Sequence, residues 1–199
     1  DIGDETRQYG PPFINNESTY FLSINRGKKS ITLNLKDKRG KDIVMKMAEK
    51  ADILLENFRP GVVDKLGIDY KQVRRVNPNI IYCSISGFGQ SGPYKDRPAY
   101  DLIVQGISGL MSITGHPNMH PVRVGVSITD LLAGIFACKA IILALYVREK
   151  TGKGQYIDVA MLDSAVATLT FIAGSYFATG KTPSRLGSAH PMIAPYQAY

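Results

Sequence analysis

The segment IIYCSISGFG, from Ile80 to Gly89, is a short apolar run that follows Pro78 and closes on two glycines. Runs of this length between turn-forming residues are typical of a strand that is buried on both faces. We therefore predict a buried strand here, and the segments on either side indicate which kind of sheet it joins.

The segments before this strand alternate between strand and helix patterns. Ser30–Lys36 alternates apolar and polar residues, which predicts a strand with one buried face, and residues 38–52 carry apolar side chains at helical spacing. Asp52–Phe58 is a second short apolar run, and two short helices are predicted in residues 62–67 and 69–77. This order predicts an α/β fold with a parallel, doubly wound sheet.

The segments after the strand continue the alternation. Residues 87–101 form a loop rich in glycine and proline, and 100–115 is predicted as one helix. A strand is expected in 155–161 and another buried helix in 162–180. The glycines of the loop do not have the GxGxxG spacing, and no GxxxxGK[ST] motif is present, so the sequence does not support a nicotinamide or ATP site.

The longest apolar run, Leu131–Val147, is nearly long enough to cross a bilayer. Lys139 interrupts its middle, while Gly134 and several alanines suit close packing against protein. We therefore predict a buried helix in a globular core and no membrane span. The helix is expected to end in a basic turn followed by Gly152.

The start of this helix carries the carboxylate of Asp130. Ser127, Thr129 and Asp130 all suit an N-cap, where an Asp is worth about 0.5–2 kcal/mol. The helix dipole is also expected to keep Asp130 ionised, which favours a carboxylate nucleophile over a general acid. The residues alone leave both roles open.

The length, charge and cysteine content of the chain limit the classes of function that it could have. The 199 residues, of which 44% are hydrophobic, are enough for one domain or most of a larger one, and the missing initial Met predicts an excerpt of a longer protein. The net charge of +7 is scattered, which favours a phosphate-bearing small molecule over nucleic acid. Cys83 and Cys138 are predicted as reduced, buried thiols, and the histidines do not form a zinc motif, so no metal is expected.

An ordered set of motifs along essentially the whole chain resembles the family III CoA-transferases. The motifs are GDETRQYGPPF (3–13), NRGKKSITLNLK (25–36), ADILLENFRPGVVDKLG (51–67), IIYCSISGFGQSGPY (80–94), RPAYD (97–101), SITD (127–130), REKTGKGQ (148–155) and AHPMIAPYQAY (189–199). Within the family, the chain is most similar to the succinyl-CoA:glutarate and related dicarboxylate transferases.

The resemblance implies a Rossmann-like parallel sheet flanked by helices. Residues 1–199 would be a partial large domain that is incomplete at both ends, without the family's first strand and without its small second domain. It also implies an interlocked homodimer for the full-length protein. The compartment would be the mitochondrial matrix in a eukaryote and the cytoplasm otherwise.

The resemblance also implies the chemistry. Asp130 matches the aspartate that attacks the acyl-CoA thioester, passing through aspartyl anhydride and aspartyl-CoA intermediates. CoA would be a substrate rather than a prosthetic group, with succinyl-CoA as the expected donor and glutarate or a similar dicarboxylate as the acceptor. The CoA contacts implied are Leu33, Asn34, Lys36, Asn57, Phe58, Arg59, Lys65 and Tyr100, and His190 is a candidate for binding the acceptor carboxylate.

Two alternatives remain at this stage. Related 2-methylacyl-CoA racemases move a proton beside the thioester with a paired acid and base, and they carry His where this chain has Tyr100. A tyrosine is unsuited to that exchange unless its pKa is strongly lowered, so transferase is favoured. The second alternative is a non-catalytic, CoA-binding fragment.

Overall fold

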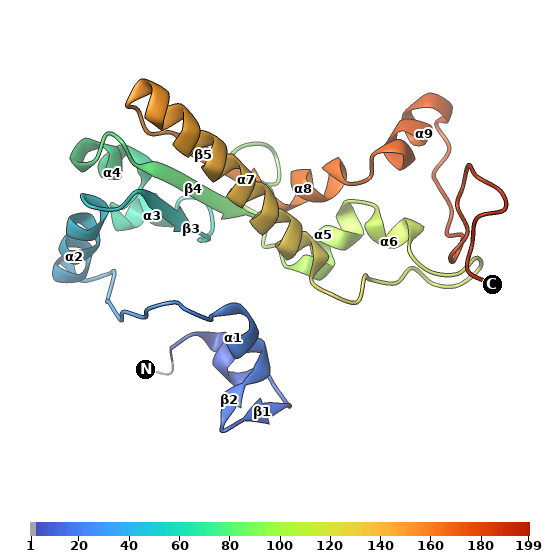
Figure 1. Ribbon diagram of the computed structural model, residues 1–199, viewed down its shortest axis with the longest axis horizontal. Coiled ribbons are helices and arrows are strands. Elements are labelled where there is room, and N and C mark those ends of the chain that lie inside the picture. The colour runs from blue at the N-terminus through green and yellow to red at the C-terminus, as the bar shows by residue number, and fades with distance from the viewer. Residues whose placement is uncertain (1–2) are drawn as a thin grey trace. The chain divides into compact units, whose positions relative to one another are not determined.

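The computed structural model describes residues 3–199, which divide into two compact units, Asp1–Lys41 and Asp42–Tyr199. The first unit contains the 3-10 helix η1 (Glu5–Gln8), the short strands β1 (Phe13–Ile14) and β2 (Glu17–Ser18), and helix α1 (Thr19–Ile24). The two strands form an antiparallel hairpin (Figure 1).

Polar contacts hold the first unit together. The buried Ser18 caps α1, because its hydroxyl accepts hydrogen bonds from the amides of Tyr20 and Phe21. Arg7 forms a 3.0 Å ion pair with Glu17, and its guanidinium lies 3.8 Å from the ring centroid of Phe21. The unit is thus built around one capped helix and one arginine.

The predicted strand at Ser30–Lys36 is wrong. Residues 31–34 have no regular structure, and Ile31 is 60% exposed. Asn34 begins a turn instead: its side chain accepts from the Lys36 amide and its carbonyl accepts from the Asp37 amide, just before α2 (Lys38–Ala48). Alternating residues form a strand only when a neighbouring strand takes up the backbone hydrogen bonds, and none of the strands in residues 3–199 pairs with this segment.

The second unit contains the predicted parallel sheet. Strands β3 (Ile53–Glu56), β4 (Ile81–Ser86) and β5 (Tyr156–Ala160) pair in the order β3-β4-β5, so β4 is central (Figure 1). Cys83 of β4 lies opposite Leu55 on one side and Ile157 on the other. The three strands and their parallel pairing confirm the fold class that the sequence predicts.

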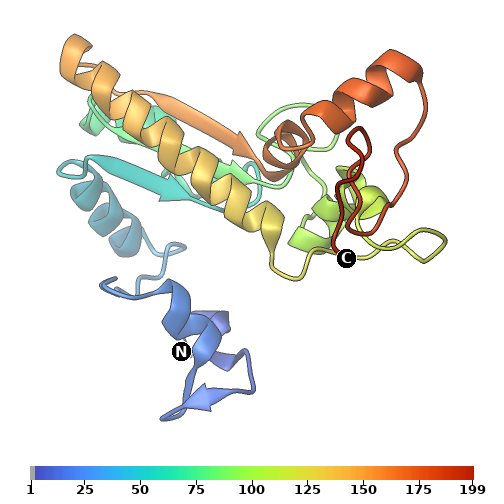
Figure 2. The same ribbon diagram turned by 45° about the vertical axis from the view of Figure 1, so that its right-hand side comes forward.

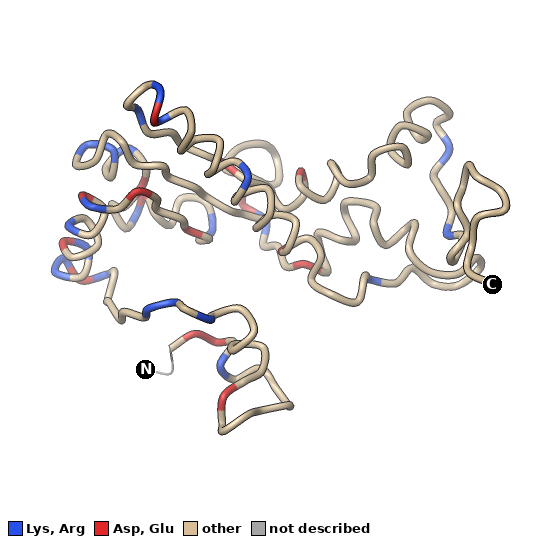
Figure 3. Tube along the Cα trace, in the orientation of Figure 1, with Lys and Arg blue, Asp and Glu red and all other residues tan. Residues whose placement is uncertain are grey.

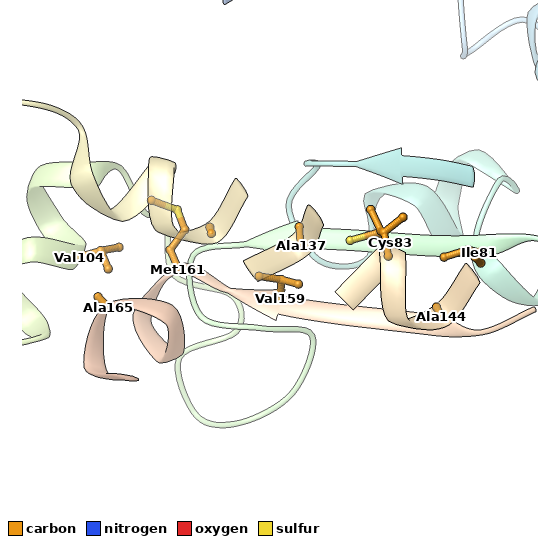
Figure 4. Packing of buried hydrophobic residues seen from close by; sticks show 10 residues of the cluster. Ile81, Cys83, Val104, Ala137, Ala144, Val159, Met161 and Ala165 are labelled. Atoms are coloured by element: carbon orange, nitrogen blue, oxygen red, sulfur yellow. The ribbon is translucent and has the colours of Figure 1, made fainter. Parts of the chain in front are cut away.

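Helices cover both faces of this sheet. The predicted short helices α3 (Val62–Leu66) and α4 (Tyr70–Val76) form, and Val73 of α4 packs with Tyr82. On the opposite face, α7 (Ile128–Thr151) runs along β4 and β5 (Figure 2). Its small side chains Ala137 and Ala144 lie over Cys83 and its neighbours (Figure 4).

The sequence predicts that helix α7 is buried in a globular core, and the structure buries it on one face only. The buried positions Ala133, Ala137 and Ala144 face the sheet, whereas Ile135 is 64% exposed. Cys138 is likewise exposed, contrary to the prediction, while burial raises the pKa of the Cys83 thiol to about 11. By length and its mean hydropathy of 2.1, α7 would suit a bilayer, yet it packs on the sheet as a helix of an α/β layer.

Two predicted helices are broken. The first divides into α5 (Asp101–Ile107) and α6 (Leu110–Ile113), because Gly109 adopts a φ of +90° that ends helical geometry. The second divides into α8 (Met161–Ala167) and α9 (Phe171–Thr179), with a bend of 82° between them. No residue of α9 is buried, so this part of the predicted buried helix is wrong as well.

Basic residues are spread along the chain rather than gathered in one stripe. Figure 3 shows them on α2, on α4, at the end of α7 and in several loops. Nucleic-acid binding usually requires a continuous basic face, so this distribution does not point to such a partner.

Candidate functional site

A cavity of about 230 Å³ opens at the carboxyl ends of β3 and β4. Ligands of parallel α/β sheets bind at this edge, because the loops that leave the strands diverge there. The cavity brings together five residues that the sequence singled out. They are Asn57, Phe58, Arg59, Tyr100 and Asp130.

Asp130 is the third residue of α7 rather than its cap. The helix begins at Ile128 and its N-cap position is Ser127, whose side chain makes no capping hydrogen bond. The cap role considered for Asp130 is therefore wrong. Among residues 3–199, the structure gives the exposed Asp130 carboxylate no hydrogen-bond partner, so it is free to meet a ligand in the cavity.

The pKa of Asp130 is shifted in the direction opposite to the one predicted. Desolvation by the surrounding cavity wall raises the pKa of this carboxyl above its usual value, and the nearby negative charge of Asp101 raises it further. These two effects outweigh the helix dipole, which by itself would lower the pKa. When ionised, Asp130 is therefore a stronger base and nucleophile than an ordinary surface aspartate.

A buried polar network anchors the start of α7 to the start of α5. One oxygen of Asp101, Oδ1, accepts from the amide of Thr129 at 3.0 Å and from its hydroxyl at 2.9 Å. The other, Oδ2, accepts from the side-chain amide of Gln105 at 2.7 Å. Gln105 in turn accepts from the amide of Val124 at 2.8 Å. The network holds residues adjacent to Asp130 and Tyr100, and sequence reasoning missed it.

The strand ends form the opposite wall. The side-chain amide of Asn57 donates to the carbonyl of Ile85 at 2.7 Å, which ties the loop after β3 to β4. At Gly87, a Cβ would lie 2.1 Å from the Cβ of Ala99, so only glycine allows the returning loop to approach this closely. The loop that leads to Tyr100 is thereby held against the end of β4.

Three basic side chains line the cavity, and sequence reasoning found only Arg59. Lys95 and Arg97 also line it, and the Arg97 guanidinium lies 4.1 Å from the ring centroid of Tyr94. The available signal was a pair of basic residues in the glycine- and proline-rich loop between β4 and α5. Such a cluster attracts phosphate groups.

The structure does not test the remaining predicted CoA contacts. Lys65, in the last turn of α3, does not line this cavity, and Leu33, Asn34 and Lys36 belong to the first unit. Their predicted contacts with CoA stay predictions.

His190 does not line the cavity either. Its ring stacks on that of Phe171, with 5.4 Å between the ring centroids, and meets the ring of Tyr196 edge-on, with 5.3 Å between the centroids. Its Nδ1 accepts a hydrogen bond from the Met192 amide at 3.1 Å. Its predicted role toward an acceptor carboxylate also stays a prediction. Within residues 3–199, no group of three or more His, Cys, Asp or Glu side chains is arranged to hold a metal ion.

Comparison with known proteins places this site in a family. The chain is 50% identical over 198 residues to an acetyl-CoA:oxalate CoA-transferase of Acetobacter aceti, and 50% identical over 197 residues to a succinyl-CoA:glutarate CoA-transferase of Mus musculus. Each alignment covers 99% of this chain, but 51% and 45% of the respective relative. The chain thus spans about half the length of the curated relatives it matches.

The fold has solved counterparts as well. The crystal structure of a CAIB/BAIF family protein from Brucella suis superposes with a TM-score of 0.93 at 45% sequence identity, covering 98% of this chain and 53% of that one. The family model described as CoA-transferase family III matches residues 2–199. The chain therefore belongs to family III of the CoA-transferases.

Proposed function

We propose that the full-length protein transfers CoA from an acyl-CoA to a carboxylic acid, with Asp130 as the nucleophile. The observation that carries this proposal is the placement of Asp130: an exposed carboxylate without a hydrogen-bond partner among the described residues, in the first turn of α7, lines a cavity that also contains Arg59, Lys95 and Arg97. A carboxylate nucleophile and a phosphate-binding set of cations are the two groups that this exchange needs.

The exchange proceeds through three covalent intermediates. An Asp130 oxygen attacks the thioester carbonyl, the C–S bond breaks, and CoA leaves as a thiolate while an acyl-aspartyl anhydride forms. The thiolate attacks the aspartyl carbonyl and releases the donor as a carboxylate, leaving an aspartyl-CoA thioester. The acceptor carboxylate displaces the thiolate to form a second anhydride, and the thiolate then attacks the acceptor carbonyl. The new acyl-CoA leaves and the Asp130 carboxylate is regenerated.

The surrounding residues suit the rest of the coenzyme. Phe58 and Met161 offer an apolar wall for the pantetheine arm, and the basic cluster suits its phosphates. Tyr100, the N-cap residue of α5, is 75% exposed and lines the cavity, which supports its proposed contact with the thioester end. A racemase is not favoured, because no histidine lines the cavity to complete an acid–base pair with Asp130.

We further propose a dicarboxylate acceptor, with succinyl-CoA as the donor. The names of two relatives support the acceptor class, since one names glutarate and the other names oxalate. The donor rests on the first of these names alone, which gives succinyl-CoA. The test mixes succinyl-CoA with glutarate, oxalate or acetate in separate reactions of the full-length protein and follows the new thioester by mass spectrometry. Glutaryl-CoA or oxalyl-CoA is expected. Acetyl-CoA alone would overturn the acceptor class, and the absence of any new thioester would count against the transferase.

Trapping the intermediate tests the nucleophile separately. Hydroxylamine added during turnover should convert Asp130 to a hydroxamate, which peptide mass spectrometry can locate. Label at Asp163, another first-turn aspartate, in α8, would contradict the assignment.

The basic cluster has its own test. Arg97→Ala is expected to raise the KM for acyl-CoA by about tenfold, with an effect that shrinks at high salt, because exposed charge pairs are screened. Arg75→Ala, on α4 and away from the cavity, is the matched control.

A further inference from the structure

Two residues of the cavity are direct neighbours of a buried pair. Asp101 follows Tyr100, and Thr129 precedes Asp130. Both members of the pair are hidden from solvent, with Asp101 9% exposed and Thr129 fully buried. A contact between them therefore fixes two backbone positions that carry cavity side chains, although they lie 28 residues apart in the sequence.

The contact has the geometry of a helix cap supplied from another helix. The amide of Thr129 is one of the first four of α7, which find no partner within the helix. Ser127, at the N-cap position, does not satisfy it, and Asp101 does so at 3.0 Å from the start of α5. The Thr129 hydroxyl adds a second hydrogen bond to the same oxygen at 2.9 Å.

We propose that Asp101 is a positioning residue that caps α7 through Thr129 and so holds the Asp130 carboxylate at a fixed place opposite Tyr100. This proposal rests on the transferase function proposed above. Gln105 completes the arrangement, because its side-chain amide occupies the second oxygen of Asp101 at 2.7 Å. Because it accepts three hydrogen bonds, the Asp101 side chain has little freedom to rotate.

The same carboxylate also acts on Asp130 through its charge. The charged groups lining the cavity around Asp130 are Arg59, Lys95 and Arg97, which favour its ionised form, whereas Asp101 behind the helix start disfavours it. Burial is the main cause of the raised pKa of Asp130, and the negative charge of Asp101 raises that pKa further. Removal of this charge is expected to make Asp130 ionise at lower pH and attack less readily.

Substitutions in the full-length protein separate these two effects. Asp101→Asn keeps an oxygen for both Thr129 donors but loses the charge and the oxygen that accepts from Gln105. The acidic limb of the kcat/KM pH profile is expected to move to lower pH. Thr129→Val removes one hydrogen bond and keeps the charge. It is expected to lower kcat about tenfold by misplacing Asp130, with the KM for succinyl-CoA within about twofold. Thr129→Ser, which restores the hydroxyl, should recover most of kcat.

The outcomes are distinguishable from a failure of the transferase proposal. If wild-type protein forms no new thioester, that proposal fails, and the ¹³C NMR titration of the Asp130 carboxyl in wild type and in Asp101→Asn still reports on the pair. A lower pKa in the variant supports the coupling, and an unchanged pKa overturns it. If wild type is active, Thr129→Val with unchanged kcat, or with a raised KM alone, overturns the positioning role. Thermal unfolding of every variant identifies a loss that comes only from misfolding.

Discussion

The starts of α5 and α7 place an aspartate in opposite environments. At α5, Tyr100 is exposed to the cavity and Asp101 behind it is buried; at α7, Thr129 is buried and Asp130 is exposed. Asp101 accepts three hydrogen bonds from side chains and backbone, and Asp130 accepts none among the described residues. The same chemical group is therefore structural where donors surround it and available for reaction where they do not.

The largest expected effect comes from removing the exposed carboxylate. Asp130→Ala in the full-length protein should lower the rate of CoA transfer by at least about 10³-fold, because the covalent route requires this oxygen. The rate is followed by separating the thioesters on a column. Asp163→Ala, a change of the same kind in the first turn of α8, should retain near wild-type turnover. Equal losses in both variants would mean that Asp130 matters only for folding.

The next effect comes from breaking the buried network. Gln105 is fully buried and joins Asp101 to the amide of Val124, so Gln105→Leu leaves one acceptor and one donor unpaired. The free energy of unfolding should fall by about 1–3 kcal/mol, as measured by chemical denaturation. Gln72→Leu, on α4 and partly exposed, should change it by no more than about 0.5 kcal/mol. A network that merely fills space would show no difference between the two.

A substitution of Tyr100, the exposed neighbour of Asp101, is expected to have a smaller effect on catalysis. Tyr100→Phe keeps the ring and removes one hydroxyl, so kcat/KM for succinyl-CoA should fall by about two- to tenfold, the range for one hydrogen bond. Steady-state kinetics give this value directly. Tyr146→Phe, which removes the hydroxyl of another exposed tyrosine in the far part of α7, should have no effect. A loss comparable to that of Asp130→Ala would instead make Tyr100 a proton donor.

The smallest effect is a pH dependence of stability. Because the pKa of Asp130 is raised above 3.8 in the folded chain, the folded state holds this proton more tightly than the unfolded state. Ionised Asp130 therefore destabilises the fold at pH values above its folded pKa, and the penalty disappears as the pH falls through that pKa toward 3.8. Asp130→Asn should melt at a slightly higher temperature than wild type at about pH 7, with the gap closing at about pH 3. A gap independent of pH would contradict the shift.

The two apolar segments around Ile31 and Leu54 show how well a sequence pattern alone predicts a strand. Both read as strands, but only Ile53–Glu56 has a neighbour, β4, that accepts its hydrogen bonds. Residues 31–34 have the alternation but pair with no strand in the part of the chain that the structure describes, and they stay irregular. A local pattern indicates which side chains could share one face of a strand. Whether that strand forms depends on a neighbouring strand with which it can pair.

The candidate site also contains residues that the sequence predicted and residues that only the folded structure reveals. The segment after β3 and the SITD motif contain Arg59 and Asp130, and the cavity unites them as the resemblance implies. Lys95 and Arg97 were missed because residues in an irregular loop have no periodicity that reveals their direction. The raised pKa of Asp130 was missed because it depends on Asp101, whose distance is set by the packing of α5 on α7.

The sequence by itself determined the parallel sheet, the long helix after SITD and the family, because these depend on local periodicity and on ordered motifs. Only the tertiary structure decided that Asp130 lies inside α7 rather than capping it, and that Asp101 supplies the cap from another helix. The physical reason is that a hydrogen bond between residues 28 positions apart, and the desolvation of a carboxyl by a cavity wall, exist only after the helices have packed.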